Sequence, residues 1–502
     1  MLACLLAGPA VLRGELVGSP RAETYGHAWV QACAAAQWPA WPSGTDLALG
    51  TASRPVIDPL PTWIAGGLAH VVGLTGAWNL LVVGWIVLAA VGGAALGRAA
   101  GLSATWVSVA AVLSPIWRGS IWSGLTEDGA IGLGMLAIAL LWSGSDVRHG
   151  SVRRAALGGV VLGVLAWCGL YLAWLGAAAA CAVALWRILR AGRARAVARL
   201  AIGAVLALGI AWPAVLPFRA RLAGVGHRFG SAPAMQEPLW RVNPWHAGDL
   251  ASFVAPGQRG ASGRLEVGEV VLGDAFVREH PTWIGYPVLA LAAVGTGPLT
   301  VPAVVLAAWS TGPHPSWAGT PMGVGNPLAV VLDGLPYASS FNHHARLWLL
   351  GELCVVLLAG AGATRIGRRV PVARLGLVPG AITLVLVDAA LLGPGPLLLP
   401  GTPTSTPSIY AALAALPPGP ITVLGANGPG VHPQELFFDQ RAHGRRVLAN
   451  PDRPEPPDLA RLKPGMIVVA LGGPDSAPVA QARSRFGDPQ TTDASGGVWV
   501  VE

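Results

Sequence analysis

An apolar segment, LACLLAGPAVL (residues 2–12), is followed closely by a polar segment, RAETYGHAW (residues 21–29). This order is typical of a helix that ends at a membrane surface, where acids, His and Trp are ordinary residues. Further along, the chain repeats the pattern, with apolar runs separated by polar loops. The sequence therefore predicts a membrane protein, and the polar cluster is the first place to look for chemistry.

The composition agrees with a membrane location. The 502 residues are 53% hydrophobic and only 12% charged, with a mean hydropathy of +0.55, whereas soluble proteins carry roughly 25% charged residues. The net charge of +8 comes mainly from arginines in short loops, which fits topology signals better than a nucleic-acid surface. No pair of the five cysteines has the spacing of a metal site or a disulfide framework, so we predict neither.

The apolar runs predict a polytopic α-helical membrane protein with about eleven transmembrane helices. They cover residues 1–17, 77–97, 102–117, 129–144, 155–168, 170–187, 200–217, 283–296, 298–310, 345–363 and 376–393. Residues 61–74 are apolar but short and Gly-rich, and they predict an interfacial or re-entrant helix that leads into the second span. Because several runs are shorter than a bilayer is thick, we expect tilted or broken helices.

The arginines predict the orientation. With the first loop outside, every short Arg-rich loop falls on the cytoplasmic side, including those of Arg98 and Arg154, as the positive-inside rule requires. The long polar loops 13–61, 219–281 and 311–344 then lie on the outer face. We predict a transmembrane domain over residues 1–394 and a small extracytoplasmic α/β domain over residues 395–502.

The tail is assigned to an α/β domain because helix and strand patterns alternate along it. Helices are predicted at residues 408–416, 435–443 and 479–486, and strands at 421–424, 446–448, 468–471 and 498–501.

Short motifs follow one another in an order that resembles a known family. They are Glu23, His27 and Trp29; Asp58-Pro59-Leu60; Ser114-Pro115; Gly124-Leu125-Thr126-Glu127-Asp128; Asp249 to Pro256; Leu335-Pro336-Tyr337; Arg346; Tyr410 to Leu413; and His443 to Arg446. In this order they resemble the bacterial GT-C-type polytopic membrane glycosyltransferases, including the YfhO-like and dolichyl-phosphate-mannose-transferase-like proteins.

The resemblance implies a reaction. A sugar would move from a polyprenyl-phosphate carrier to a glycan, lipid or protein acceptor at the outer face of a bacterial inner membrane. A carboxylate in the first outer loop would act as the general base or organise a divalent cation, and the cofactor requirement stays open. Glu23 occupies that place, where the family more often has Asp.

The same chemistry can be argued from residue types. Sugar transfer needs a base close to the attacking hydroxyl and cations that stabilise the departing phosphate. Arginine suits the second task because its fork binds phosphate bidentately. The candidate catalytic residues are Glu23, Asp58, Glu127 and Asp128, and the candidate substrate-binding residues are His27, Arg118, Arg241, His343, His344 and Arg346.

These candidates also have structural interpretations. Glu23 fits an ordinary solvated acid at the interface, and Asp58 fits a cap for the helix that follows it. Glu127 and Asp128 open a span, where the helix dipole favours acids. Glu352 lies inside a predicted span, and we assign it a structural role.

Two other functions stay open. One is a transporter or flippase of a lipid-linked glycan, although the long polar outer loops and the absence of an internal repeat count against it. The other is a GT-C-like scaffold without catalytic activity, which the Glu at position 23 keeps under consideration. In each case the partners are membrane lipids and not nucleic acid.

Overall fold

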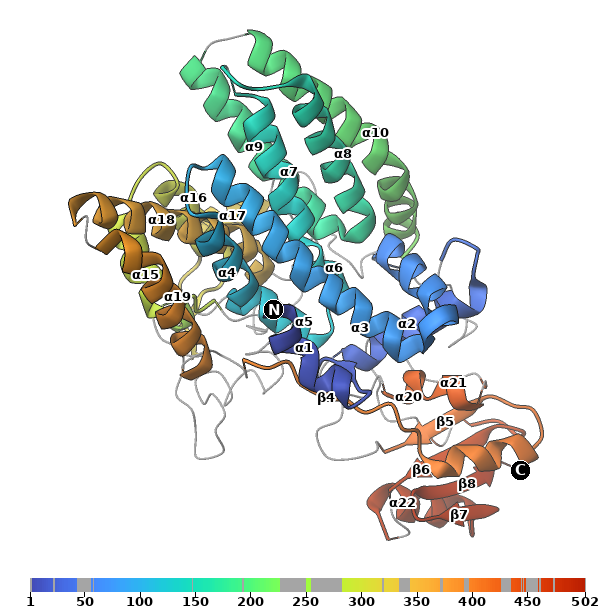
Figure 1. The fold of residues 1–502 in the computed structure, drawn as a ribbon. Coiled ribbons are helices and arrows are strands. Elements are labelled where there is room, and N and C mark those ends of the chain that lie inside the picture. Colours follow the sequence, from blue (N-terminus) through green and yellow to red (C-terminus); the bar gives the residue numbers. More distant parts are fainter. Residues whose placement is uncertain are drawn as a thin grey trace. The chain divides into compact units, whose positions relative to one another are not determined.

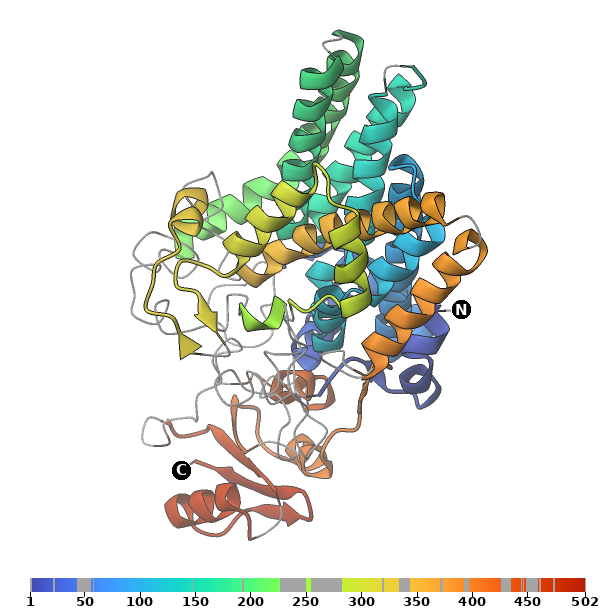
Figure 2. The ribbon, with the colours of Figure 1, turned by 90° about the vertical axis from the view of Figure 1, so that its left-hand side faces the viewer.

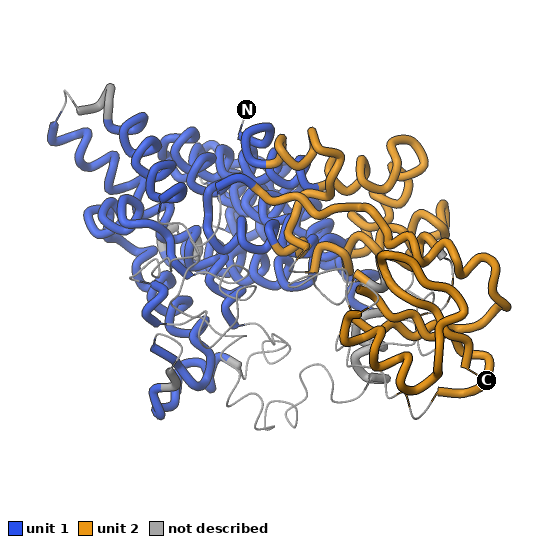
Figure 3. The backbone as a smooth tube through the Cα atoms, turned by 90° about the horizontal axis from the view of Figure 1, so that it is seen from below, with its two compact units in different colours: residues 1–6, 82–122, 126–398 blue, residues 7–81, 123–125, 399–502 orange. Residues whose placement is uncertain are grey.

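The chain forms two compact units (Figure 3). The computed structural model describes residues 2–501 apart from 21–22, 43–55, 57, 147, 192–193, 226–249, 254–281, 318–319, 334–343, 371–372, 392–396, 426–434, 444, 446, 448–458, 460–461 and 473–474. The first unit contains residues 1–6, 82–122 and 126–398, and the second contains residues 7–81, 123–125 and 399–502. The predicted domain boundary between residues 394 and 395 stays a prediction.

The first unit is mainly helical. Three helices, α1 (Leu2–Leu12), α3 (Pro59–Ala99) and α5 (Pro115–Ser123), contribute residues to both units. The other elements are α4 (Ala104–Leu113), α6 (Thr126–Gly129), α7 (Ile131–Gly144), α8 (Val152–Cys168), α9 (Leu170–Ala191), α10 (Ala194–Val225), η2 (Ala251–Phe253), α15 (Tyr286–Val294), α16 (Thr300–Ser310), β2 (Ser316–Trp317), β3 (Thr320–Pro321), α17 (Pro327–Asp333), η4 (His344–Leu347), α18 (Trp348–Arg369) and α19 (Ala373–Leu391).

These helices pack in two groups. In one, α8 packs against α7, α9 and α10 (Figure 1). In the other, α15 and α16 pack against α18, as the yellow and orange helices of Figure 2 show. Close packing depends on small residues, as is usual between membrane helices. A Cβ at Gly159 of α8, for example, would clash with the backbone of Gly203 in α10.

Each predicted apolar run overlaps at least one helix. Within the described residues, three helices are long and apolar enough to cross a membrane by length and composition: Pro59–Ala99, Ala194–Leu216 and His344–Arg369. Shorter apolar helices cover Leu2–Leu12, Ala104–Leu113, Leu170–Trp186, Thr300–Ser310 and Leu377–Leu391. The count of eleven spans stays a prediction.

The predicted short helix at 61–74 leads into the next span, and Gly73, whose φ of 73° and ψ of 166° are not helical, separates two helices within the range of α3. Glycine tolerates this backbone conformation because it has no Cβ. An interfacial or re-entrant position of the first of them stays a prediction. The predicted run 102–117 is divided at Ser114-Pro115, where α4 ends and Pro115 begins α5, a position that proline favours.

The second unit combines residues 7–81 and 123–125 with the carboxyl-terminal residues 399–502. Strand β1 (Leu16–Val17) pairs antiparallel with β4 (Gly401–Thr402), and α2 (Thr24–Gln37) packs against α20 (Glu435–Phe438). The remaining elements are η5 (Ser408–Ala415), β5 (Ile421–Leu424), α21 (Gln440–His443), β6 (Ile467–Leu471), α22 (Ala477–Phe486), β7 (Thr491–Asp493) and β8 (Gly496–Val500).

A four-stranded sheet has the strand order β5-β6-β8-β7. Strands β5 and β6 are parallel, with Ile421 opposite Ile467, and the other two pairs are antiparallel. Helix α22 covers the sheet through a core that includes Val468, Val479 and Trp499. The predicted strands at 421–424, 468–471 and 498–501 coincide with β5, β6 and β8. The polar edge strand β7 was not predicted.

Candidate active site

A buried ion cluster joins two segments of the first unit that are distant in sequence. The short helix α6 supplies Glu127 and Asp128, and the 3₁₀ turn η4 supplies Arg346. Nη2 of Arg346 lies 3.2 Å from Oε1 of Glu127, and its Nε lies 3.4 Å from Oδ2 of Asp128. The exposed fraction of the side chain is only 6% for Arg346, 4% for Glu127 and 0% for Asp128. The structure therefore brings together three of the residues that the sequence predicted for the site.

Neighbouring residues fix this cluster in place. The hydroxyl of Ser120 donates a hydrogen bond of 3.0 Å to Oδ2 of Asp128, and the ring of Tyr171 lies 5.1 Å from Cζ of Arg346. That distance is within the range of a cation–π contact. Gly169, at the break between α8 and α9, has no side chain where a Cβ would clash with the carbonyl oxygen of Glu127. The break can therefore lie directly against α6.

A second pair of buried charges lies in the same unit. Arg118 is 3% exposed and Glu352 is 2% exposed. The hydroxyl of Ser114 donates a 2.5 Å hydrogen bond to Oε2 of Glu352. The negative charge of Glu352 also attracts the guanidinium of Arg118 electrostatically. Within the described part of the chain, however, the two terminal nitrogens of Arg118 have no hydrogen-bond partner.

Buried guanidinium nitrogens without hydrogen bonds are unusual, because leaving the polar atoms of a charged group unsatisfied costs more than the 1–3 kcal/mol typical of a buried polar group. A ligand with several acceptor oxygens would supply the missing bonds. Phosphate is such a ligand, and the planar fork of arginine matches it. Arg118 thus fits the anion-binding role that the sequence predicted for it.

The donor set does not favour a divalent cation at the ion cluster. Arg346 already lies between Glu127 and Asp128 and neutralises part of their charge. Among the described residues, no group of three or more His, Cys, Asp and Glu side chains is arranged to hold a metal ion. We therefore derive no step through a metal.

The other predicted carboxylates belong to the second unit. Glu23 precedes α2 and is 41% exposed, and its Oε2 lies 3.4 Å from Nε2 of His27 one turn later. Asp58 is buried and precedes α3, and its Oδ1 accepts a 3.0 Å hydrogen bond from the hydroxyl of Thr62. This contact involves a side-chain hydroxyl, so the capping of backbone N–H groups by Asp58 stays a prediction. A meeting of Glu23 or Asp58 with Glu127 stays a prediction.

Two aromatic residues of α2, Tyr25 and Trp29, have structural roles within the second unit. Tyr25 donates a 3.0 Å hydrogen bond to the carbonyl of Pro403, and Trp29 donates one of 3.0 Å to the side chain of Gln440. Burial, together with the charges of Glu435 and Asp439, raises the pKa of Tyr25 well above its ordinary value. The phenol therefore stays protonated and serves as a hydrogen-bond donor.

Three predicted substrate-binding residues remain. His344 is fully buried in η4, two residues before Arg346. Arg241 and His343 lie outside the described residues.

Sequence reasoning missed Ser120 and Tyr171. A sequence signal for Tyr171 did exist, because it is one of only five tyrosines and follows Gly169 at a break between two apolar runs. Ser120 carries no such signal. Glu352 was assigned a structural role, although a carboxylate inside a predicted span is a functional candidate by default.

No protein-family model and no curated protein matches the sequence. Solved structures do match. ArnT from Cupriavidus metallidurans in the apo state is 16% identical, with a TM-score of 0.52 over 96% of this chain and 93% of that one. The arabinofuranosyltransferase AftD from Mycobacteria is 17% identical, with a TM-score of 0.51 over 88% of this chain. The Archaeoglobus fulgidus oligosaccharyltransferase is 12% identical, with a TM-score of 0.46 over 88% of this chain.

The chain spans 62% of the length of the oligosaccharyltransferase and 35% of that of AftD, and it matches ArnT over nearly the whole of both chains. At these identities the likeness establishes the fold and not the activity. The YfhO-like subtype stays a prediction. The chain is a polytopic helical membrane protein with the fold of the GT-C-type membrane glycosyltransferases.

Proposed function

We propose that the chain is a glycosyltransferase that moves a sugar from a polyprenyl-phosphate donor to an acceptor hydroxyl at the outer face of the membrane. The observation that carries the proposal is the buried guanidinium of Arg118, whose terminal nitrogens have no hydrogen-bond partner among the described residues. The ion cluster of Arg346 supplies a second buried guanidinium in the same unit. The fold, shared with ArnT and AftD, supports the same conclusion.

The reaction has two requirements that these residues meet. A carboxylate takes the proton of the acceptor hydroxyl while its oxygen forms a bond to the anomeric carbon of the sugar. The bond between that carbon and the phosphate oxygen breaks, and the phosphate leaves with the electron pair. The guanidinium groups stabilise the charge that develops on this leaving group.

Each side chain then has a separate role. Glu23 is the base, as the family resemblance implies, and Arg118 and Arg346 bind the phosphate of the carrier. Glu127 and Asp128 are positioning residues, because both contact Arg346 and limit the directions in which its fork can point. Such fixed donors need little reorganisation when the leaving group becomes charged.

The phosphate site can be tested by measuring the binding of undecaprenyl phosphate. This lipid is bound to ArnT in a crystal structure of that protein. The full-length protein in nanodiscs should bind this lipid, and Arg118→Gln should weaken binding at least tenfold, whereas Arg118→Lys should lose less because a charge remains. The matched control is Arg195→Gln, which removes an exposed arginine and should change nothing. Equal affinity of the Arg118→Gln variant and the parent would contradict the proposal.

Sugar transfer tests the base. Glu23→Gln should retain undecaprenyl phosphate binding and lose transfer from a polyprenyl-phosphate-linked sugar. Unchanged transfer would remove Glu23 from the mechanism. Movement of the lipid-linked sugar across sealed vesicles, without a new glycosidic bond, would instead identify a flippase.

A further inference from the structure

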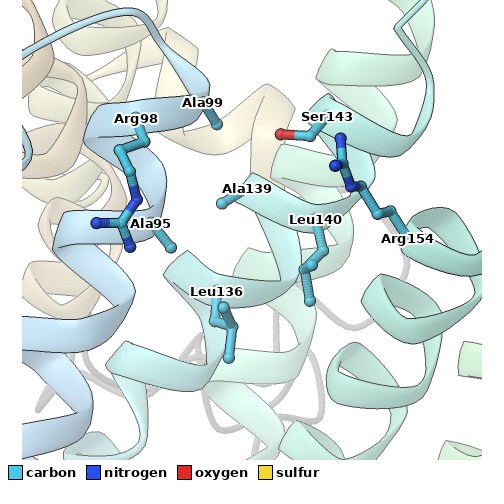
Figure 4. A pocket seen from close by; sticks show the side chains of 8 residues that line it. All are labelled: Ala95, Arg98, Ala99, Leu136, Ala139, Leu140, Ser143 and Arg154. Carbon is cyan, nitrogen blue, oxygen red and sulfur yellow. The ribbon is translucent and has the colours of Figure 1, made fainter. Parts of the chain in front are cut away.

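A pocket of about 320 Å³ lies in the first unit between the end of α3, the last turns of α7 and the first turn of α8 (Figure 4). Its lining consists of Ala95, Arg98, Ala99, Leu136, Ala139, Leu140, Ser143 and Arg154. Most of the lining is apolar, and the polar groups are two arginines and one serine. The pocket shares no residue with the ion cluster or with the pair of Arg118 and Glu352.

One face of α7 forms the floor of the pocket. Leu136, Ala139, Leu140 and Ser143 follow the spacing i, i+3, i+4, i+7, which places them along one side of a helix. The floor therefore changes from leucine side chains to a hydroxyl over about two turns. Figure 4 shows this order along α7, with Leu136 farthest from the polar end.

Two arginines lie at the polar end. Arg98 is in the last turn of α3 and Arg154 is in the first turn of α8, and both are exposed. Within the described residues neither guanidinium has an ion-pair or hydrogen-bond partner. Arg199, in contrast, donates a 2.8 Å hydrogen bond to the carbonyl of Asp146. Figure 4 shows the side chain of Arg154 extending towards Ser143.

This pocket and the candidate active site lie at opposite ends of α7. Glu127 and Asp128 precede the first residue of α7, Ile131, and Ser143 lies twelve residues after that start. At 1.5 Å per residue the separation along the helix is about 18 Å. Under the topology predicted from the arginines, the pocket faces the cytoplasmic leaflet and the ion cluster faces the outer one.

We propose that the pocket binds the phosphate headgroup of an anionic phospholipid of the cytoplasmic leaflet. Arg98, Arg154 and the hydroxyl of Ser143 contact the phosphate, and one acyl chain lies along Leu136 and Leu140. Basic pockets between transmembrane helices on the cytoplasmic side recognise anionic lipid headgroups. A free phosphate ion matches the arginines but leaves the apolar part of the lining uncovered, so the lipid is the better match.

The test uses delipidated full-length protein and native mass spectrometry with dioleoyl phosphatidylglycerol. The parent should bind phosphatidylglycerol at least tenfold more tightly than phosphatidylcholine, and the double variant Arg98→Gln/Arg154→Gln should lose this preference. The matched control is Arg148→Gln/Arg153→Gln, which removes the same charge from exposed arginines outside the lining and should retain the preference. Ala95→Phe keeps both charges but fills the pocket, and it should also weaken phosphatidylglycerol binding.

Three results would overturn the proposal. The first is an equal loss in the two double variants, which would mean that only the general positive charge matters. The second is displacement of phosphatidylglycerol by inorganic phosphate at comparable concentration, which would show that the apolar lining has no role. The third is tighter binding of undecaprenyl phosphate than of phosphatidylglycerol with the same dependence on Arg98 and Arg154, which would assign the pocket to the carrier lipid.

Discussion

Replacing Arg346 by methionine should destabilise the chain by about 3–5 kcal/mol, the usual cost of removing one partner from a buried ion pair. Methionine has a similar length and fills much of the same space, so lost packing contributes little. What is lost is the positive charge that compensates Glu127 and Asp128. Because these side chains are nearly inaccessible to solvent, water cannot take over that role.

The distances show why the effect should be large. With an effective dielectric constant of 20, charges 3.2 Å and 3.4 Å apart each attract by about 5 kcal/mol. The desolvation of Arg346, which costs several kcal/mol, opposes this attraction in the folded parent. The net loss in the Arg346→Met variant is therefore smaller than the sum of about 10 kcal/mol and falls in the range given above.

Unfolding by SDS in mixed micelles measures the effect. The triple variant Arg346→Met/Glu127→Gln/Asp128→Asn is the informative control, because it removes the three charges together and keeps the shape. It should recover more than half of the lost stability, as neutral replacements of buried ion pairs often do. If Arg346→Met costs less than about 1 kcal/mol, the pair contributes no more than an exposed surface ion pair. A triple variant as unstable as the single one would also refute the reasoning.

Two further predictions concern other parts of the chain. Gly169→Ala should cost about 1–3 kcal/mol, because its Cβ would clash with the carbonyl oxygen of Glu127, whereas Gly209→Ala, with open space at that position, should be neutral or stabilising by up to about 1 kcal/mol in SDS unfolding; equal costs would contradict the close contact. Asp493 has a pKa below its ordinary value, because burial raises it but hydrogen bonds, first those from Ser495, lower it more. The carboxylate of Asp493 therefore stabilises the chain above about pH 4, its unfolded pKa, and this contribution disappears as the pH falls through the lower folded pKa. Thermal stability of Asp493→Asn should thus be lower than that of the parent at pH 6 and approach it at pH 3, and a constant difference across this range would contradict the assignment.

Helix positions were largely predictable because hydrophobic runs long enough to be helical leave little choice of structure. Their ends were less predictable. The apolar run 102–117 gave no sign in its hydropathy of the division at Ser114-Pro115, where α4 ends and α5 begins. The polar pattern of β7 resembles a loop, and only its pairing with β8 makes it a strand.

For the candidate site, the sequence identified the charged residues but not the uncharged residues that contact them in the structure. Glu127, Asp128 and Arg346 stand out because charges are rare in such an apolar chain, and the structure places them together. Ser120 does not stand out, because its role depends on a contact across the turn between α5 and α6. Tyr171 depends in the same way on Arg346, which is distant in sequence. Pairings of this kind cannot be derived from one sequence without its fold.

The ion cluster also has a consequence for how the protein is made. Arg346 follows Glu127 by 219 residues, and ribosomes add roughly 5–20 residues per second. About 10–45 seconds therefore pass between the synthesis of the two carboxylates of α6 and the synthesis of Arg346, whose guanidinium compensates their charge. Throughout that interval the nascent chain must keep a pair of acids out of the hydrocarbon, so the insertion machinery, and not only the finished bundle, has to tolerate them.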